Sequence, residues 1–187
     1  MTRVLLLLLI GLGADCATLR YFIEPCSRAE TGCHTGDVEL AQWAMAAWEA
    51  GSGGTLKLER TTQLDKAHIR LFWAGAREGL YGEMRPIRVD GVRGGEVYVA
   101  PTVVPPNEKD GLLRDAIVYL TCLHETGHAL GLDHTANFAD IMYSFQYGGD
   151  ISEYFGRYRR QLASRSDIPK HAGMSDYDKR RLASIYR

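Results

Sequence analysis

Residues 124–134 read HETGHALGLDH and combine side chains that are well suited to metal chemistry. His124 and His128 are four residues apart, so in a helix their imidazoles lie on one face and can hold the same metal ion. Glu125 is offset by about 100° around that helix, so its carboxylate need not bind the ion and can reach a water beside it. The spacing therefore predicts a metal site with a base next to it.

A third ligand follows from the end of the same stretch. Gly131 tolerates the positive φ that stops a helix and reverses the chain, which can carry His134 back toward the ion. Three imidazoles and one water are the open coordination of a catalytic zinc, whereas a structural site is closed by four protein ligands. Imidazole ligands without a nearby thiolate favour zinc, with copper, nickel and iron as weaker alternatives.

The element that must position these histidines is a helix expected over Gly111–Leu130. The other interpretation is a surface helix whose histidines are hydrated. It is disfavoured because the apolar residues of the helix share the face of His124 and His128, which must then point inward. These apolar residues are Leu113, Ala116, Ile117 and Leu120.

The preceding sequence predicts alternating strands and one further helix. Asp37 is expected to cap a helix that runs to about Ala50, with Trp43 and Trp48 on its core face, and Gly51 ends it. Alternating or β-rich runs predict strands at Thr18–Glu24, Thr55–Arg60, Ala67–Trp73 and Glu96–Ala100.

Two further segments allow more than one interpretation. Gly79–Met84 reads either as an edge strand or as a loop. After a cap at Asp150, the apolar spacing from Ile151 to Leu162 predicts a short amphipathic helix with Arg157, Arg159 and Arg160 toward solvent. That helix either packs into the core or walls a substrate pocket; a membrane-surface helix is the weakest alternative, because its basic face is short.

Length and composition predict one globular domain. The chain has 187 residues, 45% hydrophobic and 24% charged, with a net charge of −1, which excludes disorder and gives no basic footprint for nucleic acid. Charge is uneven: residues 151–187 carry +5 and the rest −6. We interpret the basic tail as a solvated face. The lone His68 is expected to be exposed.

The N-terminus predicts export. Arg3, the apolar run Val4–Leu12 and the small residues after it are typical of a secretory signal peptide, which we assign to residues 1–16. Nine apolar residues are too short to span a bilayer, and no later segment is long and apolar enough, so no transmembrane span is expected. A lipid anchor on Cys16 is the weaker alternative, because Asp15 fits a lipobox poorly.

Export to an oxidising compartment guides the interpretation of the cysteines. Cys26 and Cys33 lie seven residues apart in a polar stretch, and we expect a local disulfide between them. Zinc ligation by this pair is the weaker alternative, since no second pair exists. Cys122 is expected to be a buried apolar residue.

The stretch 124–134 resembles the zinc-binding consensus of metzincin metalloendopeptidases, HExxHxxGxxH followed by a Met-turn. Met142, eight residues after His134 and directly before Tyr143, resembles the Met-turn of the matrixin branch. Thr135 and Ser144 depart from that branch, which commonly has Ser and Pro at these positions. No cysteine-containing propeptide, second histidine set for a structural zinc or haemopexin-like repeat is found.

The resemblance implies an α+β zincin domain over residues 17–187. It has a twisted, mostly parallel sheet with an antiparallel edge strand, an active-site helix and a C-terminal helix, which here matches Ser175–Tyr186. By the same resemblance, Leu80–Met84 would be the edge strand that pairs with an extended substrate. Met142 would provide an apolar floor beneath the ligands.

The function expected from these features is secreted, zinc-dependent hydrolysis of peptide bonds. His124, His128 and His134 would hold one zinc, which activates a water, and Glu125 would be the general base. Calcium finds no support in the sequence. We expect a monomer whose partner is a protein or peptide substrate. The alternative is a non-catalytic zinc-containing binding module on a metzincin scaffold, which would have no use for Glu125.

Overall fold

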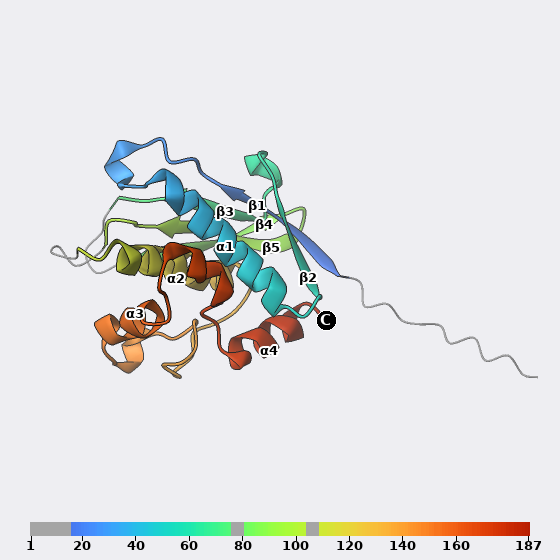
Figure 1. The fold of residues 1–187 in the computed structure, drawn as a ribbon. Helices are drawn as coiled ribbons and strands as arrows, with labels where there is room; N and C mark the ends of the chain where they lie inside the picture. Colours follow the sequence, from blue (N-terminus) through green and yellow to red (C-terminus); the bar gives the residue numbers. More distant parts are fainter. Residues whose placement is uncertain (1–15, 76–80, 104–108) are drawn as a thin grey trace, which may run out of the picture.

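A five-stranded sheet forms the frame of the protein, as seen in a computed structural model that describes residues 16–75, 81–103 and 109–187 (Figure 1). The strand order is β2-β1-β3-β5-β4, and all neighbours are parallel except β4 and β5, which are antiparallel. The predicted α+β class, with a mostly parallel sheet and an antiparallel edge strand, is confirmed. The strands are β1 (Ala17–Ile23), β2 (Leu56–Arg60), β3 (Ile69–Trp73), β4 (Gly82–Val89) and β5 (Val92–Val99).

The β4–β5 hairpin is longer than the sequence interpretation allowed. Asp90 and Gly91 form its two-residue turn with φ of 51° and 81°, as a type I′ turn requires. Strand β5 begins at Val92. The sequence predicted a start at Glu96, because Gly94 and Gly95 interrupt the pattern of strand-forming residues. Gly94 is needed there because a Cβ atom would overlap the carbonyl of His68. The edge strand expected at Gly79–Met84 exists from Gly82 onward; its first part lies outside the described residues.

Two long helices cover one face of the sheet. Figure 1 shows α1 (Thr35–Gly51) and α2 (Gly111–Ala129) side by side over the strands, with α3 (Ile151–Arg159) and α4 (Asp176–Ile185) below them in this view. The core lies between sheet and helices and includes Leu40, Trp48, Leu71, Val97 and Leu123. Short 3₁₀ helices connect these elements: η1 (Ala29–Thr31), η2 (Leu64–Lys66), η3 (Phe145–Tyr147) and η4 (Arg165–Lys170).

The start of α1 corrects one expectation. His34, not Asp37, is the N-cap, and Asp37 accepts a 2.8 Å hydrogen bond from the His34 backbone N–H as the third helical residue of a capping box. Asp37 is also only 1% exposed and forms an ion pair with Arg114 of α2. The buried carboxylate therefore joins the two helices as well as capping one of them.

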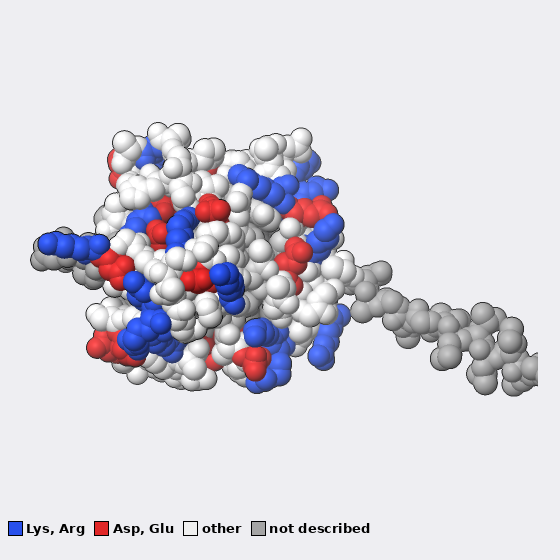
Figure 2. Space-filling model, viewed as in Figure 1, with Lys and Arg blue, Asp and Glu red and all other residues white. Residues whose placement is uncertain are grey.

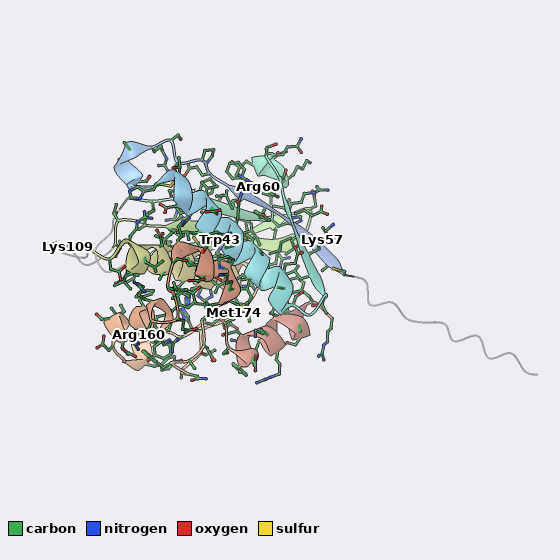
Figure 3. All side chains as sticks on the ribbon, in the orientation of Figure 1. Trp43, Lys57, Arg60, Lys109, Arg160 and Met174 are labelled. Carbon is green, nitrogen blue, oxygen red and sulfur yellow. A yellow bond between two sulfur atoms is a disulfide. The ribbon has the colours of Figure 1, made fainter. Side chains whose placement is uncertain are left out.

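The two tryptophans of α1 differ in their surroundings. Trp48 is fully buried, and its indole N–H donates to the carbonyl of Leu123 in α2, as expected for a core residue. Trp43, labelled on α1 in Figure 3, is only partly buried and lies under the guanidinium of Arg165. Trp43 shares the helical spacing of the core residues, but it lies at the margin of the core.

The basic C-terminal segment is not simply a solvated face. Arg159 pairs with Asp110 at 2.7 Å, and Arg165 pairs with Asp115 and Glu39 at 3.3 and 3.2 Å. Figure 2 accordingly shows blue and red side chains beside one another rather than one basic patch. The excess positive charge of the tail is thus partly neutralised by acids from α1 and the start of α2.

Four smaller expectations can be compared with the structure, and a fifth cannot. Cys26 and Cys33 form the predicted disulfide, and Cys122 is fully buried. His68 is partly buried rather than exposed, because its Nδ1 accepts a 3.1 Å hydrogen bond from the backbone N–H of Arg20. Within the described part of the chain, no helix is long and apolar enough to cross a membrane. The predicted signal peptide lies almost wholly outside the described residues.

Candidate metal centre

Helix α2 carries two of the predicted ligands near its C-terminal end. The Nδ1–H of His124 donates to the carbonyl of Ile141 at 2.7 Å, and the Nδ1–H of His128 donates to the carbonyl of Leu132 at 2.8 Å. These bonds fix both ring orientations and place the proton on Nδ1, which leaves Nε2 with a free lone pair. Each imidazole is therefore oriented and protonated as a metal ligand must be.

The third imidazole reaches the same point, as the sequence predicts. Gly131 ends the helical stretch with φ of 102°, and the reversed chain brings Nε2 of His134 to 3.2 Å from Nε2 of His124 and 3.1 Å from Nε2 of His128. Zinc–nitrogen bonds of about 2.0–2.1 Å in a tetrahedral arrangement separate two ligand nitrogens by about 3.3–3.4 Å. The spacing of the three rings fits a single small transition-metal ion.

Without a cation between them, the three Nε2 atoms would lack enough hydrogen-bond donors for their lone pairs. His124 and His128 both present lone pairs, and one N–H on His134 Nε2 could satisfy only one of them. Burial is the largest cause that lowers the pKa of all three rings, and neighbouring imidazoles also lower it for His124 and His128; together these effects bring the pKa of His124 to about 3. The rings are neutral at pH 7, which is the form that binds metals.

Glu125 lies beside the histidines but not among them. Its side chain is 8% exposed and packs against Gly82, the first residue of edge strand β4. Burial, and to a smaller extent the charge of Glu83, raise the pKa of Glu125 to about 8. A cation held by the histidines would oppose this shift by favouring the carboxylate, so Glu125 is poised to exchange a proton near the ion.

Met142 lies directly beneath the histidine-bearing helix. It is completely buried, and a Cβ atom on Gly127 would overlap its sulfur. The chain around it is held to the His134 loop: Thr135 N–H donates to the carbonyl of Met142 at 2.8 Å, and Ser144 N–H donates to that of Thr135 at 3.1 Å. The predicted floor position is occupied by Met142, and a glycine in the helix makes room for it.

Helix α4 fixes this turn from the other side. Oδ2 of Asp178, which is fully buried, accepts a 2.9 Å hydrogen bond from the N–H of Ile141. Ile141 in turn supplies the carbonyl that orients His124, so α4 is connected to this predicted ligand through one residue. The hydroxyl of Tyr154 in α3 also donates to this carbonyl at 3.1 Å.

The histidines open onto a cleft with a volume of about 440 Å³. One wall is the start of β4, and the opposite wall comes from the turn after Met142 and from α3. Tyr154 and Phe155 of α3 are buried in the core, as one interpretation of this helix expects, and they also line the cleft, whereas Ile151 is 36% exposed at its rim. Aromatic contacts hold the lining of the cleft together: Tyr143 and Phe145 pack on Tyr154, and Tyr81, which directly precedes β4, packs on Phe155 of α3.

The sequence interpretation missed several residues that build the site. Gly82, Gly127 and Asp178 contact catalytic candidates or their supports across long stretches of sequence, so no local pattern reveals those contacts. A partial signal existed for Asp178, because Ser175 and Asp178 have capping-box spacing. The arginines of α3 were also placed wrongly in part: Arg157 stacks on Phe138 and Tyr154, Arg159 is partly buried, and of the three only Arg160, at the end of α3 in Figure 3, is exposed.

Comparison with known proteins adds no assignment. No protein-family model matches this chain, and no curated protein matches it. The chemistry of the site therefore has to be argued from its own geometry.

Proposed function

We propose that this protein is a secreted zinc endopeptidase of the metzincin type, resembling the matrixin branch. One observation carries the proposal: three neutral imidazole nitrogens converge at an open cleft, with the buried carboxylate of Glu125 beside them. The mostly parallel sheet, its antiparallel edge strand and the buried Met142 beneath the ligands are what a metzincin domain would require.

The chemistry divides between the ion and the chain. His124, His128 and His134 would hold zinc, which when bound supplies a Lewis acid that polarises a carbonyl and lowers the pKa of water. Glu125 accepts the proton of the attacking water and then delivers it to the leaving amine. Burial suits this carboxylate to both steps, because it favours the protonated form between them.

The substrate would be an extended stretch of protein or peptide. Among the described residues β4 pairs on one side only, with β5, so its other edge offers main-chain donors and acceptors next to the histidines. Such pairing binds a peptide backbone whatever its side chains are. The disulfide between Cys26 and Cys33 is compatible with export, which remains part of the proposal.

The decisive experiment is Glu125→Gln, which preserves shape and removes the proton acceptor. The variant should keep its zinc and fold, whereas cleavage of a peptide library should fall by at least about a hundredfold, in line with typical losses of a general base. Zinc occupancy is measured in the same preparations. Glu39→Gln, at an exposed carboxylate on α1, is the matched control and should keep full activity.

Two results would contradict the proposal in different ways. Full activity in Glu125→Gln would show that another group, such as Asp133 or Asp140, is the base. Wild-type protein that binds zinc but cleaves no peptide in a broad library would favour the alternative, a non-catalytic zinc-containing binding module.

A further inference from the structure

Strand β4 approaches the carboxylate-bearing side chain of Glu125 at a single glycine. A Cβ atom on Gly82 would lie 2.7 Å from Cγ and 3.1 Å from Oε1 of Glu125, and 2.8 Å from the methyl carbon of Thr121. All three distances are shorter than ordinary van der Waals contacts. The backbone at Gly82 does not have a positive φ, so any L-residue could adopt it. What position 82 requires is the absence of a side chain.

The strand has little freedom to move away from the helix. Gly82 is in register with the buried Val99 of β5, and a second glycine, Gly95, contacts α2 in the same way. A Cβ atom on Gly95 would lie 2.8 Å from the Cβ atom of Ala129. The β4–β5 pair thus lies against α2 at two glycines, and an added side chain at position 82 must displace Glu125 or Thr121 rather than the whole hairpin.

We propose that Gly82 is a positioning residue for the general base. Its bare backbone forms one side of the space that holds the Glu125 carboxylate, and it lets the base lie directly against the edge strand that would carry the substrate. This inference rests on the proposed function. It adds that the backbone at the start of β4 determines the position of the Glu125 carboxylate. The base and the strand that would bind the substrate are then in direct contact at Gly82.

The test is Gly82→Ala in the zinc-loaded protein, with Gly111→Ala as the matched control. Gly111 also lacks a positive φ, and a Cβ atom there would meet nothing within 4 Å. Zinc content should be unchanged in both variants, because the three atoms nearest to a Cβ at position 82 belong to Glu125 and Thr121 and not to a histidine. We expect kcat to fall about 10- to 100-fold in Gly82→Ala with little change in KM, since misplacing a reacting group by about 1 Å has effects of this size. Gly111→Ala should retain wild-type kcat.

The same substitution in the Glu125→Gln background separates positioning from substrate binding. Once the base is gone, adding the methyl group at position 82 should change the residual rate by less than about threefold, because the two effects are not independent. An equal loss in both backgrounds, or a rise in KM without a loss of kcat, would overturn the proposal. If Gly82→Ala alone does not fold, Gly82→Ala with Thr121→Ser removes the contact with the threonine methyl and keeps the one with Glu125.

A structural measurement keeps this inference separate from the proposed function. In crystal structures of wild type and Gly82→Ala, the Glu125 carboxylate should be displaced in the variant while β4 keeps its register with β5. If wild type cleaves no peptide, the proposed function fails, but a displaced carboxylate still establishes the contact. An unmoved Glu125 in a correctly folded variant would overturn the inference even if the enzyme is active.

Discussion

At the scale of single residues, the Nδ1 atoms of His124 and His128 matter as much as the Nε2 atoms that would bind the ion, because the Nδ1 bonds orient the rings. His124 and His128 are held through Nδ1 by backbone carbonyls of Ile141 and Leu132, which come from the segments that follow α2. Helix α2 sets the distance between the two imidazoles, and the chain that follows the helix sets the orientation of each ring. His134 then depends on that same return, because it follows Gly131 by only three residues. Ligand and orienting groups are therefore parts of one short stretch of chain.

His134→Ala should lower zinc affinity by at least about tenfold, because two imidazoles make a poor zinc site and loss even of a group outside the ligand set costs about 10–100-fold. Competition with a chromophoric chelator measures the affinity. The control is His171→Ala, since His171 lies outside the histidine cluster. Unchanged zinc affinity in His134→Ala would remove the three-histidine model.

At the scale of elements, the site depends on α4 as much as on α2. Asp178 accepts hydrogen bonds from the backbone and hydroxyl of Ser175, which cap α4, and from the backbone of Ile141, which precedes Met142. One buried carboxylate therefore ties the last helix to the turn beneath the ligands. Because that carboxylate is fully buried, its hydrogen bonds are not easily replaced by water.

Asp178→Ala should destabilise the protein by about 2–4 kcal/mol, because it removes one half of the α4 capping box, worth about 1 kcal/mol, and leaves the buried N–H of Ile141 unpaired at about 1–3 kcal/mol. Urea unfolding of the zinc-free protein measures this without a contribution from metal binding. Asp176→Ala is the control: the Asp176 side chain is 82% exposed and, among the residues that the structure describes, forms an ion pair only with Lys179, so a loss below about 1 kcal/mol is expected. Equal losses in the two variants would argue against the link to Ile141.

The elements were predictable from sequence wherever one periodic pattern determined them. Helix α2, with three ligands in or just after it, and α3, capped by Asp150, follow directly from apolar spacing. The first half of strand β5 did not follow from the sequence, because Gly94 and Gly95 allow close approaches to β3 and α2 that only the folded sheet contains. The same holds for Gly82: its role depends on Glu125, 43 positions later in the chain. The histidine spacing and the helices could be predicted from sequence, whereas contacts between distant segments of the chain could not.

At the scale of the whole molecule, ion pairs join the C-terminal segment to the start of α2. The basic segment after residue 150 contributes Arg159 and Arg165 to ion pairs with Asp110 and Asp115, which lie at the start of α2. These pairs are partly exposed, so each contributes little alone. They nevertheless connect α3 and η4 to the N-terminal end of the helix whose other end carries the metal ligands. Ion pairs thus hold the N-terminal end of α2, and α4 supports the chain beyond its C-terminal end, where the three histidines lie.

Zinc should stabilise the whole fold, because the ion would connect α2 to the returning loop and relieve the unfavourable contact of three imidazole nitrogens. At free zinc about 100-fold above its dissociation constant, linkage predicts about 2.7 kcal/mol, less any binding to the unfolded chain. For a domain of this size that corresponds to a rise in Tm of about 5–10 °C. Scanning calorimetry with and without chelator measures it. Glu125→Gln should show the same rise, since Glu125 is not a ligand, whereas His134→Ala should show little. A zinc-dependent rise that survives in His134→Ala would place the stabilising ion elsewhere in the protein.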